Sequence, residues 1–114
     1  MYKRQIVAGA NDADMVLAGN TVRKNKGGLA FALNGQVVGE LPLPVAGLMS
    51  TESAESVEEK LQALKAALKA HGISEDIDAF MTLAFVSLPV IPKLRLNTYG
   101  IVDVDAQRIV PAVF

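Results

Sequence analysis

Apolar residues recur at helical spacing in two stretches of the chain. The first stretch, residues 13–25, follows Asn11 and Asp12, whose side-chain oxygens can cap the start of a helix. Gly27 and Gly28 are expected to end this helix, because glycine adopts the left-handed capping conformation without strain. The apolar positions of the first stretch, spaced i, i+3 and i+7, are Met15, Ala18 and Val22.

The second and longer helix is predicted to begin between Thr51 and Ala54 and to stop at Gly72. Glutamates gather in its first half and lysines in its second half, which is the distribution that the helix dipole favours. His71, the one histidine of the chain, falls in the last turn, where an imidazole interacts favourably with the free carbonyl groups. The apolar stripe of this helix consists of Val57, Leu61, Leu64 and Leu68.

Two apolar runs, Leu29–Leu33 and Gln36–Leu41, flank the dipeptide Asn34-Gly35, which is the strongest short signal for a β-hairpin. A two-residue turn predicts that Leu33 lies opposite Gln36, Phe31 opposite Val38 and Leu29 opposite Glu40. One face of the hairpin would then carry Leu29, Phe31, Leu33 and Val38. Small residues on the other face, Ala30 and Ala32 beside Val37, predict the close approach of a covering helix.

Shorter elements are expected elsewhere. Ile6–Ala8 is predicted to be a buried strand, and Val45–Met49 a short helical turn after Pro44. In the second half, a short helix should start at about Asp78 and give way to extended chain near Ser87. The sequence further predicts a half-exposed strand in which Leu94 and Leu96 alternate with Lys93 and Arg95, and a last short strand at Ile101–Val104.

Together these elements predict an α/β (α+β) fold, with a small mixed sheet that includes a hairpin and is covered by two main helices. The 114 residues are enough for one domain, which we expect to span residues 6–114. Residues 1–5, MYKRQ, are interpreted as a foreign leader. They lack the apolar segment of a signal peptide.

The composition narrows the classes of partner. Apolar residues make up 51% of the chain, which is enough to leave apolar surface for a protein partner after the core is filled. The net charge of −1 argues against nucleic acid as a partner, and no apolar run reaches the length of a membrane span. The absence of cysteine excludes disulfides and thiolate metal sites, and it fits a cytoplasmic protein.

No complete catalytic or metal-binding set is recognisable in the sequence. The turn Gly9–Asp12 lies between a predicted strand and a helix, where α/β proteins bind anions, but a tight turn with an Asn or Asp cap is the favoured interpretation. Asp103 and Asp105 would lie on one face of a strand, about 6–7 Å apart, a spacing that a glycosidase could use. A solvated strand edge is the favoured interpretation there. We therefore predict no catalytic residue and no metal ligand in this chain.

Three long stretches of the chain resemble the C-terminal domain of adenine deaminase, an enzyme family of the amidohydrolase superfamily. These stretches are IVAGANDADM at Ile6–Met15, GGLAFALNGQVVGELPLPVAGLMS at Gly27–Ser50, and FMTLAFVSLPVIPKLRL from Phe80 followed by GIVDV at Gly100–Val104. The family's H-x-H metal signature has no counterpart among the 114 residues, so the resemblance carries no metal ligand onto a numbered position.

The resemblance implies a C-terminal fragment of an enzyme that converts adenine to hypoxanthine and ammonia in purine salvage. It implies a divalent metal (manganese, iron or zinc) in a catalytic barrel that this chain does not contain, and no cofactor in the chain itself. The expected partners are that barrel, adenine for the intact enzyme, and further copies in a homo-oligomer. The residues that we expect to line a pocket or an interface are Asn11, Asp12, Met81 and Thr82.

Two other hypotheses stay open on the sequence. The chain could be a free-standing, non-catalytic α/β module that self-associates through its apolar surface. Alternatively, it could carry a small active site of its own at the Gly9–Asp12 turn.

Overall fold

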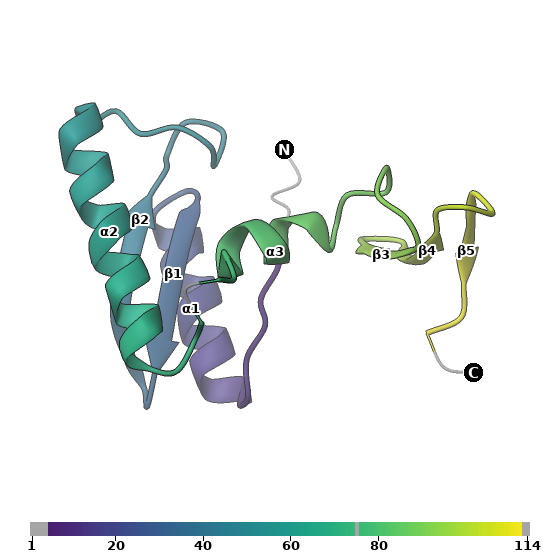
Figure 1. The fold of residues 1–114 in the computed structure, drawn as a ribbon, viewed down its shortest axis with the longest axis horizontal. Helices are drawn as coiled ribbons and strands as arrows, with labels where there is room; N and C mark the ends of the chain where they lie inside the picture. The colour runs from purple at the N-terminus through teal and green to yellow at the C-terminus, as the bar shows by residue number, and fades with distance from the viewer. Residues whose placement is uncertain (1–4, 75, 113–114) are drawn as a thin grey trace. The chain divides into compact units, whose positions relative to one another are not determined.

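The computed structural model of the chain describes residues 5–74 and 76–112 (Figure 1). It divides into two compact units: the first unit runs from Val7 to Ile77, and the second begins at Asp78 and also includes Ile6. The predicted α+β class is confirmed, because helices accompany two small antiparallel sheets of two and three strands. The interpretation of residues 1–5 as a leader stays a prediction, since residues 1–4 lie outside the described chain.

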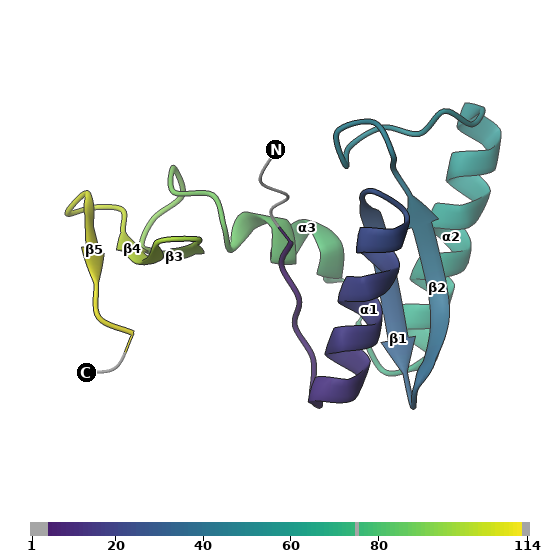
Figure 2. The same cartoon turned by 180° about the vertical axis from the view of Figure 1, so that it is seen from behind.

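The first unit is a β-hairpin between two helices. Its elements are α1 (Asp12–Lys24), β1 (Gly28–Leu33), β2 (Gln36–Pro42) and α2 (Ala54–Ala70). Figures 1 and 2 together show that α1 and α2 lie on opposite faces of the hairpin. Each face of the two-stranded sheet therefore packs its apolar side chains against one helix, in agreement with the predicted pair of covering helices.

The ends of α1 were predicted to within one residue, but its C-terminal cap differs from the prediction. Asn11 is the N-cap, and its side chain accepts a hydrogen bond of 2.8 Å from the Asp14 amide. At the other end, Lys26 adopts the left-handed conformation (φ 62°), while Gly27 donates to the Val22 carbonyl at 2.9 Å. The left-handed residue is therefore Lys26, one position before the glycine that the sequence suggested.

The hairpin turn is confirmed, but its register changes halfway along the strands. Asn34 and Gly35 both have positive φ (51° and 75°), as a type I′ turn requires, and Leu33 lies opposite Gln36 as predicted. A β-bulge between Phe31 and Ala32 then shifts the pairing, so that Phe31 lies opposite Gly39 and Leu29 opposite Leu41.

The predicted pairs with Val38 and Glu40 are therefore wrong, and burial explains the difference. In the predicted register Glu40 would share the apolar face of Leu29, because directly paired residues of an antiparallel sheet point to the same side. The extra residue in β2 moves Leu41 onto that face instead, where it is buried, and leaves Glu40 exposed.

The core of the first unit lies between β2 and α2. Leu41, Leu64 and Leu68 are buried, and Leu64 is the most enclosed, with 1% of its surface exposed. The predicted start of α2 is confirmed, with Ser53 as the N-cap, and the helix ends with His71 as the C-cap. The His71 ring lies against the Phe31 ring, with centroids 5.8 Å apart, which ties the end of α2 to β1.

Two short elements predicted for the first half are wrong. Ile6–Ala8 is not a strand, because the described chain places no partner strand beside it, and Val7 is 42% exposed. Val45–Met49 is a tight turn closed by a bridge between its end residues, and Ala46 and Gly47 have positive φ. Helical φ and ψ are excluded at these two positions, so no helical turn can form there.

The second unit consists of one short helix and a three-stranded antiparallel sheet. Its elements are α3 (Ala79–Phe85), β3 (Leu94–Asn97), β4 (Gly100–Asp103) and β5 (Arg108–Val110), and the strand order is β3-β4-β5. The predicted short helix is confirmed: Asp78 caps it by accepting from the Met81 amide at 2.9 Å, and the chain leaves the helix before Ser87.

The prediction that the last strand lies at Ile101–Val104 is wrong, because β5 follows it. Strand β4 ends at Asp103, whose side chain accepts a hydrogen bond of 2.9 Å from the Ala106 amide and thereby closes the turn to β5. Asp105 lies in this turn, so Asp103 and Asp105 do not share the face of a strand as predicted. The three residues of β5 are too few for a strand period to be recognised.

Candidate functional site

The Gly9–Asp12 turn, the best sequence candidate for a pocket, is occupied by hydrogen bonds that hold the fold. The Asn11 side chain accepts from the Asp14 amide, and its Nδ2 donates to Asp14 Oδ2 at 2.8 Å. The Asp14 carboxylate also accepts from the backbone amides of Asn34 (3.0 Å) and Gly35 (2.8 Å) at the tip of the hairpin. Asp14 thus joins the first turn of α1 to the β1–β2 turn.

The electrostatics of Asp14 agree with this role. Hydrogen bonds from the Asn11 side chain and from the Gly35 and Asn34 amides lower the pKa of the Asp14 carboxyl group, since they stabilise its charged form. A general acid or base near neutral pH needs a raised carboxyl pKa instead. The arrangement around Asn11 and Asp14 therefore favours the interpretation as a capped turn over a separate active site.

The four residues expected at a pocket or an interface lie on the surface, two in each unit. Asn11 and Asp12 are exposed at the start of α1 in the first unit, and Met81 and Thr82 are exposed in α3 of the second unit. The structure describes the two pairs separately. Their role at a pocket or an interface stays a prediction.

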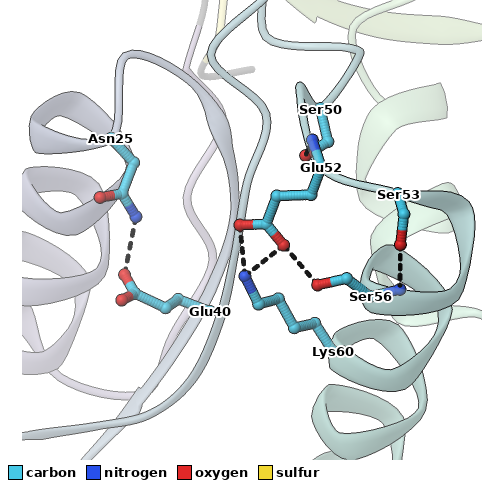
Figure 3. Close-up of polar contacts among 7 residues, drawn as sticks. All are labelled: Asn25, Glu40, Ser50, Glu52, Ser53, Ser56 and Lys60. Carbon is cyan, nitrogen blue, oxygen red and sulfur yellow. Dashed lines mark hydrogen bonds and ion pairs between the residues drawn. The ribbon is translucent and has the colours of Figure 1, made fainter.

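A second polar cluster, at the start of α2, was not singled out by the sequence (Figure 3). Lys60 and the Ser56 hydroxyl both bond to the Glu52 carboxylate, the latter at 2.6 Å, and together they lower the pKa of Glu52, with Lys60 as the larger cause. The available signal was the spacing of Ser56 and Lys60, four and eight residues after Glu52, which lies just before the Ser53 cap of α2. Like the Ser53 cap beside it, this cluster stabilises the start of the helix.

Figure 3 also shows a tie between the end of α1 and β2, where Asn25 Nδ2 donates to Glu40 Oε2 at 2.7 Å. This contact crosses fifteen residues of sequence, and no periodic pattern predicts it. It places the exposed Glu40 of the bulged strand against the helix end, and so couples the two elements on the polar surface of the first unit.

A metal site cannot be assembled from the donors that the structure describes. Within residues 5–74 and 76–112, no three His, Cys, Asp or Glu side chains lie close enough together to hold an ion. His71 packs on Phe31, and Asp14 and Glu52 are engaged in the hydrogen bonds given above. Catalytic zinc sites require three protein ligands, so these residues do not fit such a metal.

The second unit instead presents apolar side chains to the surface. No side chain between Asp78 and Ala112 is fully buried, and Val90 and Tyr99 are among the most exposed apolar residues of the chain. In β3 the alternation is the reverse of an ordinary amphipathic strand: Leu94 and Leu96 are 48% and 52% exposed, while Arg95 between them is more buried. The strand was predicted, but this reversal was not.

Comparison with known proteins identifies the family. Residues 3–108 match the family described as the adenine deaminase C-terminal domain. "Adenine deaminase 2" of Carboxydothermus hydrogenoformans is 47% identical over 106 residues, which are 93% of this chain and 19% of the relative. The adenine deaminase of Kosmotoga olearia is 55% identical over 98 residues, covering 86% of this chain and 17% of the relative.

A third relative, the adenine deaminase of Shigella sonnei, is 48% identical over 100 residues, which are 88% of this chain and 17% of the relative. The chain thus spans about a fifth of the length of the curated relatives it matches. The chain belongs to the adenine deaminase C-terminal domain family.

Proposed function

We propose that this chain is the non-catalytic C-terminal domain of an adenine deaminase, a metal-dependent amidohydrolase that acts in purine salvage. In that reaction water adds to the purine carbon that bears the amino group, ammonia leaves, and hypoxanthine forms. The relatives are about five times as long as the segment that this chain matches, so they have room for a separate catalytic barrel. The proposal places the reaction in that barrel.

The donor chemistry of the chain supports a non-catalytic role. A divalent ion, manganese, iron or zinc, would activate the attacking water in the intact enzyme. The side chains in the described part of the chain do not fit such an ion, because His71 caps α2 and the hydrogen-bonded carboxylates of Asp14 and Glu52 hold a turn and a helix start. We therefore assign no step of the reaction to residues of this chain.

The single observation that carries the proposal is the surface of the second unit. A unit in which none of the described side chains is fully buried, while many large apolar ones are exposed, lacks the core that would stabilise it alone. Such surfaces mark sites of protein contact. The catalytic barrel of the same enzyme is the partner that the family membership supports.

The remaining parts of the proposal follow from the same enzyme. We place it in the cytoplasm as a homo-oligomer that binds adenine and neither nucleic acid nor membrane. The net charge of −1 supports the first exclusion. None of the helices among the described residues has the length and apolar character of a membrane span.

An association experiment tests the proposal. The Kosmotoga olearia enzyme would be produced without the 98 residues that match this chain, and the purified chain would be titrated into it by calorimetry. We expect a saturable 1:1 complex. The intact Kosmotoga enzyme is the matched control, because its own domain should occupy the binding surface and prevent uptake of the chain.

The same experiment separates the proposal from its main alternative. If the chain does not bind the truncated enzyme, and analytical ultracentrifugation shows that it forms defined oligomers, the chain is a free-standing, self-associating module. The coding DNA upstream of residue 6 gives an independent discrimination: an open reading frame that encodes an H-x-H motif supports the deaminase, and a ribosome site followed by a start codon supports the module.

A further inference from the structure

The three-stranded sheet of the second unit has one face that is largely apolar. Leu94 and Leu96 point to the same side of β3, and the register places Leu96 opposite Ile101, which in turn lies opposite Val110. Because directly paired residues share a face in an antiparallel sheet, these four side chains lie together. Leu94 lies opposite Asp103, and Asp103 opposite Arg108, so the edge of this face also carries one carboxylate and one guanidinium group. We call this set the leucine face: Leu94, Leu96, Ile101 and Val110.

The orientation of the leucine face is fixed by the contacts of the neighbouring residues. The Arg95 guanidinium group folds back on the chain, where Nη2 donates to the Pro92 carbonyl at 2.6 Å and Nη1 to the Leu94 carbonyl at 2.7 Å. The Leu96 amide donates to the Val86 carbonyl at 2.9 Å, which ties β3 to the segment after α3. A slip of β3 by one residue, which would turn the leucines inward, would break these bonds.

A strand whose arginine is bonded to the backbone and whose leucines are exposed is unfavourable in water, because an exposed leucine does not gain the free energy of burial. Arg95 alternates with the two leucines in β3 and therefore lies on the other face of the sheet. A face with four apolar side chains and one charge of each sign fits a partner surface that is mainly apolar.

We propose that the leucine face docks on an apolar surface of the catalytic part of the same adenine deaminase. The inference rests on the proposed function. About four fifths of each relative lies outside the matched segment, and covalent attachment gives that part a far higher effective concentration than a second copy has. The second unit then completes its core across the domain boundary.

A chimera tests the inference: the matched 98 residues of the Kosmotoga enzyme are replaced by the corresponding residues of this chain. Two variants are compared, Leu94→Gln with Leu96→Gln, and the control Val16→Gln, whose residue is 61% exposed on α1 of the first unit. Hydrogen exchange of the β3 and β4 amides and adenine turnover are measured. We expect the leucine variant to speed exchange of these amides about tenfold or more and to lower turnover, and the control to change neither.

The outcomes separate this inference from the proposed function. A wild-type chimera without turnover contradicts the proposed function. An active chimera in which the leucine variant behaves like the Val16 control overturns the leucine face alone. Should the leucine variant fail to fold, the unsubstituted proteins decide: equal exchange of the β3 and β4 amides in the isolated chain and in the chimera overturns the inference, and so does a dimer of the isolated chain that protects these amides.

Discussion

At the scale of single residues, polar side chains connect the elements of the first unit, and Asp14 is the clearest example. Its carboxylate receives hydrogen bonds from one side chain and two backbone amides, and these bonds join a helix start to a hairpin tip twenty residues away. Asp14 lies in the first turn of α1, where the helix dipole favours an acidic residue. Its contact with Asn34 and Gly35 depends on tertiary structure.

Substitution Asp14→Asn should lower the melting temperature at pH 7, because the amide loses the charge and directs N–H groups at N–H donors. The pKa of Asp14 is lowered in the folded state, so its contribution is complete above the ordinary carboxyl pKa of about 4 and is lost as the pH falls through the folded value. The gap between variant and wild type should therefore narrow below pH 4. Melting curves from pH 7 to pH 2.5 test this, with Asp12→Asn in the same turn as the control.

Gly39 is required by the packing of α2 on the bulged strand. A Cβ atom at this position would lie 2.7 Å from Leu64 Cδ1, in the most enclosed part of the core. We expect Gly39→Ala to lower the free energy of unfolding by about 1–3 kcal/mol, measured by urea denaturation.

Gly19 lies in the same unit, and its substitution by alanine should have the opposite effect on stability to that at Gly39. A Cβ there would meet Val7 Cγ2 at an ordinary 3.6 Å, and alanine favours the interior of α1. Gly19→Ala should therefore stabilise the chain by about 0.5–1 kcal/mol. Equal effects of the two substitutions would contradict the described packing of β2 against α2.

At the scale of elements, short sequence patterns correctly predicted the turns and helices whose formation depends on neighbouring residues. Asn34-Gly35 predicted the hairpin turn, and the spacing of the Leu64 and Leu68 stripe predicted α2. The bulge in the hairpin was not predictable, because it is set by the gain from burying Leu41 against a helix that lies later in the sequence. The turn at Ala46-Gly47 has a similar origin, since Gly27 approaches it so closely that a Cβ on Gly27 would lie 2.5 Å from the Gly47 Cα.

The end of α1 gives a prediction at this scale. Lys26 occupies the left-handed position that glycine prefers, which costs a residue with a Cβ about 1 kcal/mol. Lys26→Gly should raise the free energy of unfolding by about that amount, whereas Lys26→Ala should change it little. Urea denaturation of the two variants checks the conformation, and a stabilising effect of alanine alone would contradict it.

At the scale of the whole molecule, the two units differ in how much of their apolar surface they bury. The first unit has a core around Leu64, and the second has no fully buried side chain among its described residues. The high apolar content of the sequence indicated that surface would remain for a partner, but not where. We propose that this surface includes Leu94 and Leu96, whose exposure could not be predicted because their alternation with charged residues is typical of an ordinary strand.

The candidate site residues also divide into roles set by neighbouring residues and roles that depend on other protein. The sequence correctly predicted Asn11 as a helix cap, since this role depends on a few neighbouring residues. Whether Asn11, Asp12, Met81 and Thr82 also line an interface depends on protein beyond this chain, and stays a prediction. That the catalytic centre lies outside the 114 residues is likewise part of the proposed function.

We propose that the chain serves an adenine deaminase without performing its chemistry. Ammonia release from adenine, measured with the purified chain in the presence of manganese, tests this most directly. We expect no release above the buffer control, and full release from the intact Kosmotoga olearia enzyme assayed alongside. Sustained turnover of adenine by the purified chain alone would contradict it.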